Sequence, residues 1–435
     1  MQRFFSYVLT VCVLCLATAG TARAQDWSQW RGPNRDGVWK DTNIVQKFAS
    51  EELAPKWRVP ISNGYSGPTV AEGRVYITDR VTEPKEVERV HCFDWKTGKQ
   101  VWSFTYDCPY VGVSFPNGPR ASVTIHDGKA YSLGSMGNLY CFDAATGKVL
   151  WNKDLNTEYK IRLPDWGIAA SPLIEGENVI VFISGSNDSC VVALDRKTGA
   201  EKWKALPDRA SYSSPIVINQ AGKRVLICWT AERVVGMDPQ TGKVYWGQPF
   251  PPAQLVGYIT TPVVEKDWLF LTAAAEGSLM LRLNSQEPGI EKVWHRRGQN
   301  ARNTDALQTL MTTPILRDGY IYGIDYFGEL RCLDAKTGDR LWEEKTIMPR
   351  AQWASAHLVQ NGDRTFIFNE KGELILARLT PKGYEELSRA KLIKPTRGQL
   401  NERGGVTWAH PAYAYGHVFV RNDEELVCID LTEKG

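Results

Sequence analysis

Aromatic and arginine side chains recur together in the short segments that precede apolar runs beginning with a small residue and proline. The ligand-binding candidates among them are Tyr65, Arg120, Trp166, Arg209, Tyr212, Tyr258, Arg302, Arg350, Trp353, Arg403 and Trp408, with Phe115 as a further aromatic of the same kind. Flat rings and planar guanidinium groups are suited to a sugar, an aromatic anion or an extended peptide. The same residues would equally fit a structural role, with rings packed between repeats and arginines paired with local acids.

Motifs for catalysis are absent from the sequence. The six histidines show no metal-binding spacing such as His-Glu-x-x-His, and the sequence has no phosphate-binding loop, nucleophile elbow or dinucleotide fingerprint. We therefore expect no catalytic residue and no metal ligand. The formal net charge of +3 also argues against a protein built mainly to bind nucleic acid.

The first 24 residues have the order of a secretory signal peptide. Arg3 is followed by an apolar run and then by Ala22-Arg23-Ala24, so cleavage is expected between Ala24 and Gln25. Cys12 and Cys15 lack the preceding small residue that a lipid-attachment site requires. No later stretch approaches the roughly 20 apolar residues of a membrane span. These features predict a periplasmic or secreted protein that does not span a membrane.

Seven cysteines follow the predicted cleavage site, and their positions do not suggest a disulfide framework. Cys92, Cys141, Cys332 and Cys428 each lie two residues before an aspartate, at a position where related segments have alanine or glycine. Such a position indicates a tight, buried strand site in which cysteine acts as a small apolar residue.

One phrase, Asp-x-x-Thr-Gly followed by tryptophan, recurs along the chain. Its complete copies are Asp94, Gly98 and Trp102; Asp143, Gly147 and Trp151; Asp195, Gly199 and Trp203; Asp238, Gly242 and Trp246; and Asp334, Gly338 and Trp342. Trp57, Trp294 and Leu387 mark degenerate copies, which gives eight marks spaced by about 47 residues. A repeat of this length is typical of a β-propeller blade.

Each copy predicts a hairpin corner between two strands, because aspartate can accept backbone N–H bonds and glycine supplies the positive φ that closes the turn. Two more strand patterns precede each corner, which makes four strands per repeat. The last copy stops where its tryptophan strand should begin, and residues 56–59 provide that strand at the other end of the chain. We therefore predict an all-β, eight-bladed propeller over residues 56–435, closed by its terminal strands, with a leader segment at 25–55.

The strand that begins each repeat should be innermost, so the candidate residues above should surround one mouth of the central channel. Acidic residues in the other loops of that face, among them Glu232, Glu329, Glu370 and Asp423, would form an outer rim around a more basic centre.

These repeats resemble those of the pyrroloquinoline quinone (PQQ)-type propellers, and the segment from Trp27 to Gly37 is similar to the leader of that family. The resemblance implies either a PQQ-dependent alcohol dehydrogenase, with Ca²⁺ held by Glu and Asn oxygens, or a scaffold of the BamB-like branch, which acts in outer-membrane protein assembly. The chain departs from the dehydrogenases, since it has no adjacent cysteines, no Cys-x-x-Cys-His haem motif and no long insertions. It departs from BamB-like lipoproteins in lacking a suitable lipid-attachment cysteine.

The sequence thus favours a secreted or periplasmic, non-catalytic scaffold that binds a protein or another ligand. The alternatives are a quinoprotein-like alcohol dehydrogenase and a carbohydrate-binding propeller. We expect a monomer without a cofactor, PQQ and Ca²⁺ belonging to the dehydrogenase alternative, and an unidentified protein or glycan as partner.

Overall fold

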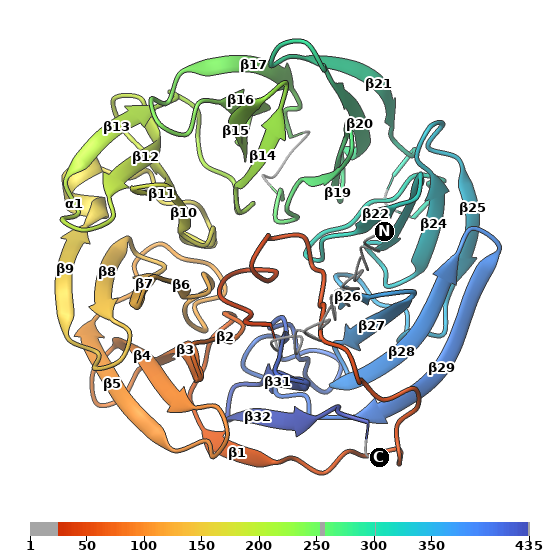
Figure 1. Cartoon of the computed structure of the whole chain (residues 1–435), viewed down its shortest axis with the longest axis horizontal. Coiled ribbons are helices and arrows are strands. Elements are labelled where there is room, and N and C mark those ends of the chain that lie inside the picture. The colour runs from red at the N-terminus through yellow and green to blue at the C-terminus, as the bar shows by residue number, and fades with distance from the viewer. Residues whose placement is uncertain (1–24, 253–256, 301, 434–435) are drawn as a thin grey trace, which may run out of the picture.

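The computed structural model describes residues 25–252, 257–300 and 302–433, so the predicted signal peptide lies outside the described residues. Eight four-stranded antiparallel sheets surround a central axis as the blades of a propeller (Figure 1). The predicted fold is confirmed. Within these ranges, no helix is long and apolar enough to cross a membrane.

The strands of the first four blades run in chain order from the axis outward. They are β2 (Thr69–Ala71), β3 (Arg74–Val81), β4 (Val87–Asp94) and β5 (Gln100–Asp107) in blade 1; β6 (Thr124–His126), β7 (Lys129–Leu133), β8 (Asn138–Asp143) and β9 (Val149–Asp154) in blade 2; β10 (Leu173–Glu175), β11 (Asn178–Gly185), β12 (Ser189–Asp195) and β13 (Glu201–Ala205) in blade 3; and β14 (Ile216–Gln220), β15 (Lys223–Trp229), β16 (Arg233–Met237) and β17 (Val244–Pro249) in blade 4. The short helix α1 (Leu155–Tyr159) follows β9.

Blades 5 to 7 repeat this order, and blade 8 combines the two ends of the chain. The strands are β18 (Val263–Glu265), β19 (Trp268–Ala273), β20 (Gly277–Leu283) and β21 (Ile290–Arg296) in blade 5; β22 (Ile315–Arg317), β23 (Tyr320–Ile324), β24 (Leu330–Asp334) and β25 (Arg340–Glu344) in blade 6; β26 (Ala356–Asn361), β27 (Arg364–Asn369), β28 (Glu373–Thr380) and β29 (Gly383–Lys391) in blade 7; and β30 (Ala412–Ala414), β31 (His417–Arg421), β32 (Glu425–Asp430) and β1 (Trp57–Pro60) in blade 8.

The repeated phrase joins each blade to its neighbour. At the corner of blade 2, Asp143 Oδ1 accepts hydrogen bonds from the backbone N and the hydroxyl of Thr146, at 2.8 and 2.7 Å. Trp102 of blade 1 packs on this corner and donates its indole N–H to the Ala144 carbonyl at 3.0 Å. Gly147 has a φ of +73°, and a Cβ there would lie 2.6 Å from the Trp102 ring, so both the turn and the docking ring require glycine. The apolar cores accordingly lie between neighbouring blades.

Blade 5 has a degenerate corner, and the side chain of Gln220 compensates for it. Trp246 of blade 4 donates its indole N–H to Gln220 Oε1 at 3.0 Å, and Gln220 Nε2 donates to the carbonyls of Gly289 and Asn284 in blade 5. Gln220 is buried, so the bridge forms away from water. A side-chain amide thus replaces the direct contact between tryptophan and corner.

Replacing this bridge should destabilise the protein. We expect Gln220→Met to lower the free energy of unfolding by about 1–3 kcal/mol, because the Trp246 N–H and the Gly289 carbonyl lose their buried partner. Chemical denaturation measures the change. Gln248→Met is the matched control, since the Gln248 amide donates to the adjacent Pro249 carbonyl. Equal effects of the two substitutions would contradict the bridging role.

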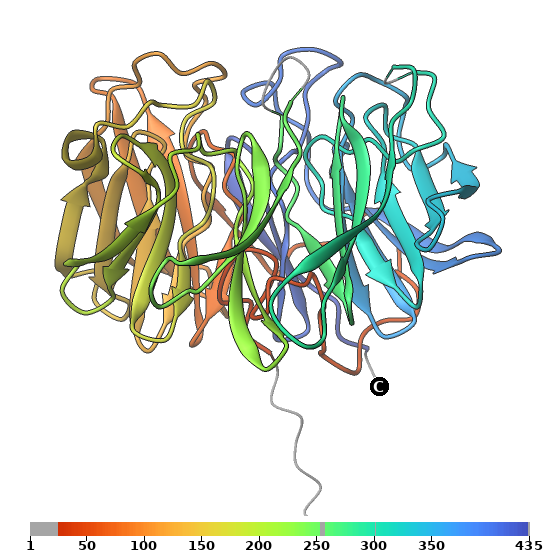
Figure 2. The same ribbon diagram turned by 90° about the horizontal axis from the view of Figure 1, so that it is seen from above.

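The ring closes through the predicted terminal strands. β1 pairs with β32 from Trp57↔Cys428 to Pro60↔Glu425. The leader buries Trp27, Trp39 and Phe48 in a core shared with blades 7, 8 and 1. In the side view of Figure 2 it lies at the end of the propeller opposite the longer connections between blades.

Candidate ligand-binding site at the channel mouth

The connections that enter the innermost strands surround a cavity of about 380 Å³. Six of the sequence-predicted residues line it, each from a different connection between blades: Tyr65, Arg120, Trp166, Tyr212, Trp353 and Trp408. The inner strands lie around the axis, as the repeat pattern predicted (Figure 1). The topology therefore brings together side chains that lie up to 343 positions apart in the sequence.

Four predicted arginines lie away from this cavity. Arg209 Nε lies 3.0 Å from Glu232 Oε1, Arg350 Nε 2.6 Å from Glu329 Oε1, and Arg403 Nη2 3.1 Å from Glu370 Oε2. Arg302 lies over the Phe327 ring, with its guanidinium carbon 5.9 Å from the ring centroid. Three carboxylates expected to form a separate acidic rim, Glu232, Glu329 and Glu370, are thus ion-pair partners of these arginines, so their charges offset those of the arginines.

Tyr258 also lies outside the cavity. It is fully buried, stacks on Trp229 with centroids 4.5 Å apart, and donates its hydroxyl to the Phe250 carbonyl at 2.8 Å. Its ring packs within the core between blades 4 and 5. The neighbouring candidate, Tyr212, occupies a similar place in the repeat and does line the cavity.

Two aromatic pairs form parts of the cavity wall. Trp166 and Tyr212 stack with centroids 4.7 Å apart and an interplanar angle of 30°. Phe115 meets Trp353 edge to face at 6.3 Å. Hydrogen bonds hold these rings, because the Trp166 backbone N donates to the Tyr212 hydroxyl at 3.2 Å and Trp353 Nε1 donates to the Tyr326 hydroxyl at 2.7 Å. The walls are therefore aromatic and fixed in orientation.

Arg120 supplies a positive charge to the wall. Its guanidinium donates to the carbonyls of Gly118 at 2.9 Å, Phe115 at 2.6 Å and Ser114 at 3.2 Å, and lies over the Tyr65 ring. Burial lowers the pKa of Arg120. Among the described residues, no carboxylate forms an ion pair with it.

The floor consists of residues that the sequence did not single out as binding candidates. Trp30 of the leader donates its indole N–H to Thr261 Oγ1 at 2.7 Å and meets the His410 ring edge to face at 4.5 Å. His357 lines the cavity beside it. The sequence offered one indication of this floor, the high density of tryptophan and arginine between Trp27 and Arg35. No local sequence pattern, however, predicts that this segment lies in the channel.

Both histidines of the floor are neutral at pH 7. Burial lowers the pKa of His357 to about 4 and that of His410 to about 3. His410 Nε2 accepts from the Gly67 backbone N–H at 3.2 Å, so the proton of the neutral ring lies on Nδ1. His357 Nε2 donates to the Trp408 carbonyl at 2.9 Å.

Arg35 fixes the leader below this floor. Its guanidinium donates to the carbonyls of Pro215 at 2.9 Å and of Ser171 and Pro172, at the starts of the inner strands of blades 3 and 4. Gln29 Oε1 accepts from Arg35 Nε at 2.9 Å. These bonds hold Trp30 in place from the side opposite the mouth.

The chain is similar in sequence to several known proteins. A family model described as outer membrane protein assembly factor BamB matches residues 86–344 and 298–435. The 1-butanol dehydrogenase (quinone) of Thauera butanivorans is 32% identical over 168 residues, which are 34% of this chain and 25% of that protein. The outer membrane protein assembly factor BamB of Yersinia pestis is 25% identical over 240 residues, 52% of this chain and 58% of that protein. The matches thus cover less than two thirds of both relatives.

The solved structure of BamB from Moraxella catarrhalis has the same fold. It superimposes with a TM-score of 0.60 at 15% identity, covering 87% of this chain and 99% of that chain. Together with the family match and the eight blades, these likenesses show that the chain belongs to the PQQ-like eight-bladed propeller family whose model is described as outer membrane protein assembly factor BamB.

Proposed function

We propose that this protein is a non-catalytic binding module whose channel mouth holds a ligand or a segment of a partner protein. The observation that carries the proposal is the convergence of six predicted residues, from six connections, on one aromatic cavity. Concave, mostly apolar sites with few oriented polar groups are typical of ligand binding. In keeping with the predicted signal peptide, we place the protein in the periplasm or outside the cell.

The cavity favours a flat apolar ring that carries a negative charge. Its aromatic walls offer stacking. Both Nη atoms of Arg120 already donate to protein oxygens, so this residue offers a positive charge, which has no ion-pair partner in the described part of the chain. The indole N–H groups of Trp30, Trp353 and Trp408 already donate to protein acceptors. A sugar needs many hydrogen bonds, so this arrangement is less suited to the carbohydrate alternative.

The groups around the cavity support binding rather than oxidation chemistry. Ca²⁺ takes six to eight oxygen ligands, whereas Glu276 is the one acidic side chain among the described residues that line the cavity. The described ranges contain no group of three His, Cys, Asp or Glu side chains that could hold a metal ion. His357 and His410, with pKa values of about 4 and 3, are poor general bases at neutral pH. The donor set does not fit a Ca²⁺-dependent quinone site, although the match to the butanol dehydrogenase keeps that enzyme as the second candidate.

Binding of the dye 2-naphthol-6-sulfonate, a flat and fluorescent aromatic anion, tests the proposal. We expect the chain from Gln25 onward to bind the dye, and Trp166→Ala and Trp408→Ala each to weaken binding by about tenfold, because each removes a stacking wall. Trp268→Ala is the control, since Trp268 is also half-buried but lies outside the cavity. Melting curves show whether each variant is folded.

Two outcomes would contradict the proposal. Equal dye affinity in all three variants would mean that the mouth is not the binding site. A rise in melting temperature that requires PQQ and Ca²⁺ together would favour the dehydrogenase.

A further inference from the structure

Residues 109–118 are part of the connection between blades 1 and 2, and we name them the mouth loop. Phe115 of this loop lines the cavity. Phe115 at its tip contacts Trp353, which belongs to the connection between blades 6 and 7. The backbone N of Ser114 donates to the Asp165 carbonyl at 2.7 Å, and Asn117 Nδ2 donates to Asp423 Oδ1 at 2.7 Å. The loop thus contacts the connections between blades 2 and 3 and between blades 6 and 7, and also the turn between β31 and β32 in blade 8.

The two residues that meet over the mouth both have left-handed backbone conformations. Phe115 has a φ of +52° and Trp353 a φ of +65°, a region that bulky side chains rarely adopt. Arg120 holds the Phe115 carbonyl at 2.6 Å, and the Trp353 backbone N donates to the Tyr326 carbonyl at 3.0 Å. Such strained residues persist where their surroundings fix them, and they are common at ligand sites.

The outer side of the mouth loop is uncovered. Val111 is 72% exposed and Phe115 is 42% exposed, although Phe115 also lines the cavity. Figure 2 shows this connection, in orange, standing at the end of the propeller opposite the leader. The Phe115 ring is therefore fixed by its contact with Trp353 rather than by a covering core.

We propose that Phe115 and Trp353 determine the specificity of the cavity by forming a bar that divides its mouth. The bar admits one flat ring or one extended chain at a time and excludes bulky or branched groups. Blade order supports this geometry, because connection 1/2 lies three blades from connection 6/7 around the ring (Figure 1). The contact between Phe115 and Trp353 therefore joins two separated parts of the rim of the opening. The inference rests on the proposed function in taking the cavity as the ligand site.

A cysteine inside the cavity can report on this filter without a known ligand. Ala169 lines the cavity, and the seven cysteines of the described chain are buried and free, so Ala169→Cys provides the reporter. Its labelling is timed with methyl methanethiosulfonate, a small reagent, and with fluorescein maleimide, a bulky one. We expect Phe115→Gly and Trp353→Gly each to accelerate bulky labelling by about tenfold and to change small-reagent labelling little.

Glycine suits both test positions, because it adopts positive φ without strain and removes only the ring. Val111→Gly is the matched control, since it removes a more exposed apolar side chain from the same loop and should leave both rates unchanged. Unaltered bulky labelling in both glycine variants would overturn the filter. If Trp166→Ala still weakens dye binding in that case, the proposed function stands without the filter. Faster bulky labelling without dye binding would support the filter and reject the flat aromatic anion as ligand.

Discussion

Deletion of residues 25–59 should leave a chain that does not fold. The deletion removes most of β1, so the edge of β32 loses its partner from Trp57↔Cys428 to Val59↔Leu426. It also removes Trp27, Trp39, Phe48 and Trp57 from the core that joins blades 7, 8 and 1. Truncation of one buried aromatic side chain costs about 3–5 kcal/mol. Four together cost about 12–20 kcal/mol, which equals or exceeds the stability of most domains, roughly 5–15 kcal/mol.

Size-exclusion chromatography and circular dichroism of the truncated chain measure the result. We expect aggregation or an unfolded chain, because an open blade edge can pair with other chains. Arg58→Ala is the matched control within β1: Arg58 is exposed and pairs with Glu425 at 3.4 Å, so its loss should cost at most about 1 kcal/mol. A truncated chain with an unchanged melting curve would refute closure of the ring by the leader and β1.

The fold was predictable because each repeat carries its own turn chemistry. Asp143 and Gly147 specify a corner locally, and the docking tryptophan recurs at a distance fixed by the four strands of a blade. The closing strand was predictable for the same reason, since the last repeat lacks its tryptophan strand and residues 56–59 carry it. The degenerate corner of blade 5 was predictable as well, because it lies at the regular repeat spacing. The bridge that Gln220 forms there was not predictable, because it depends on a contact between blades that no local sequence pattern encodes.

The residues that line the cavity were predictable only in part, because the direction of a loop side chain depends on its neighbours. Tyr212 and Tyr258 precede inner strands in similar ways, yet one lines the cavity and the other packs against Trp229. The directions of the arginine side chains also depend on their neighbours. Arg350 turns away from the cavity because it forms an ion pair with Glu329 of the preceding blade. Trp30 reaches the floor because the leader crosses the channel, and sequence spacing does not specify that path.

The stability of the folded protein should fall steeply as the pH drops from 6.5 towards 4, because the floor holds two histidines in neutral form. The pKa of His357 falls from 6.5 in the unfolded chain to about 4 in the folded one, so the unfolded state binds more protons in this window. The difference corresponds to roughly 3 kcal/mol for His357 alone. Burial is the largest cause, and Arg31 of the leader adds to it. His410, with a pKa of about 3, extends the loss to lower pH.

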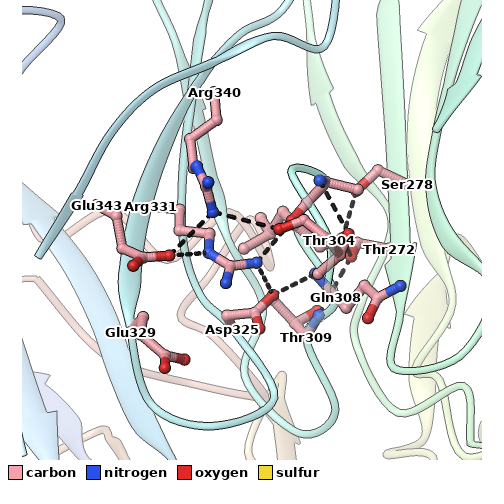
Figure 3. A network of polar contacts seen from close by, with 12 residues as sticks. Thr272, Ser278, Thr304, Gln308, Thr309, Asp325, Glu329, Arg331, Arg340 and Glu343 are labelled. Atoms are coloured by element: carbon pink, nitrogen blue, oxygen red, sulfur yellow. Dashed lines mark hydrogen bonds and ion pairs between the residues drawn. The ribbon is translucent and has the colours of Figure 1, made fainter. Parts of the chain in front are cut away.

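Asp325 acts in the opposite direction, within the polar network of Figure 3. Burial raises its pKa from 3.8 to about 7, although Arg331 lies 2.8 Å from Oδ1 and the Gln308 backbone N donates to the same oxygen at 2.7 Å. Glu329 and Glu343 contribute to the rise. The folded state therefore binds more protons between pH 4 and 7, and this carboxyl removes stability as the pH rises through that window.

Two conservative variants separate these contributions, because their effects on the pH dependence have opposite signs. His357→Gln keeps an N–H donor for the Trp408 carbonyl but cannot take up a proton, so the loss of stability from pH 6.5 to 4 should shrink. Asp325→Asn keeps an acceptor for the Gln308 backbone N–H, and asparagine already occupies the equivalent turn position in blade 7 as Asn369. The loss of stability between pH 6.5 and 4 should then grow, because the carboxyl that opposes it is gone. Urea unfolding at pH 4, 5, 6 and 7 measures each slope. Parallel curves for the wild type and His357→Gln would show that the buried imidazole does not set the acid sensitivity, and the neutral floor of the cavity would have to be abandoned.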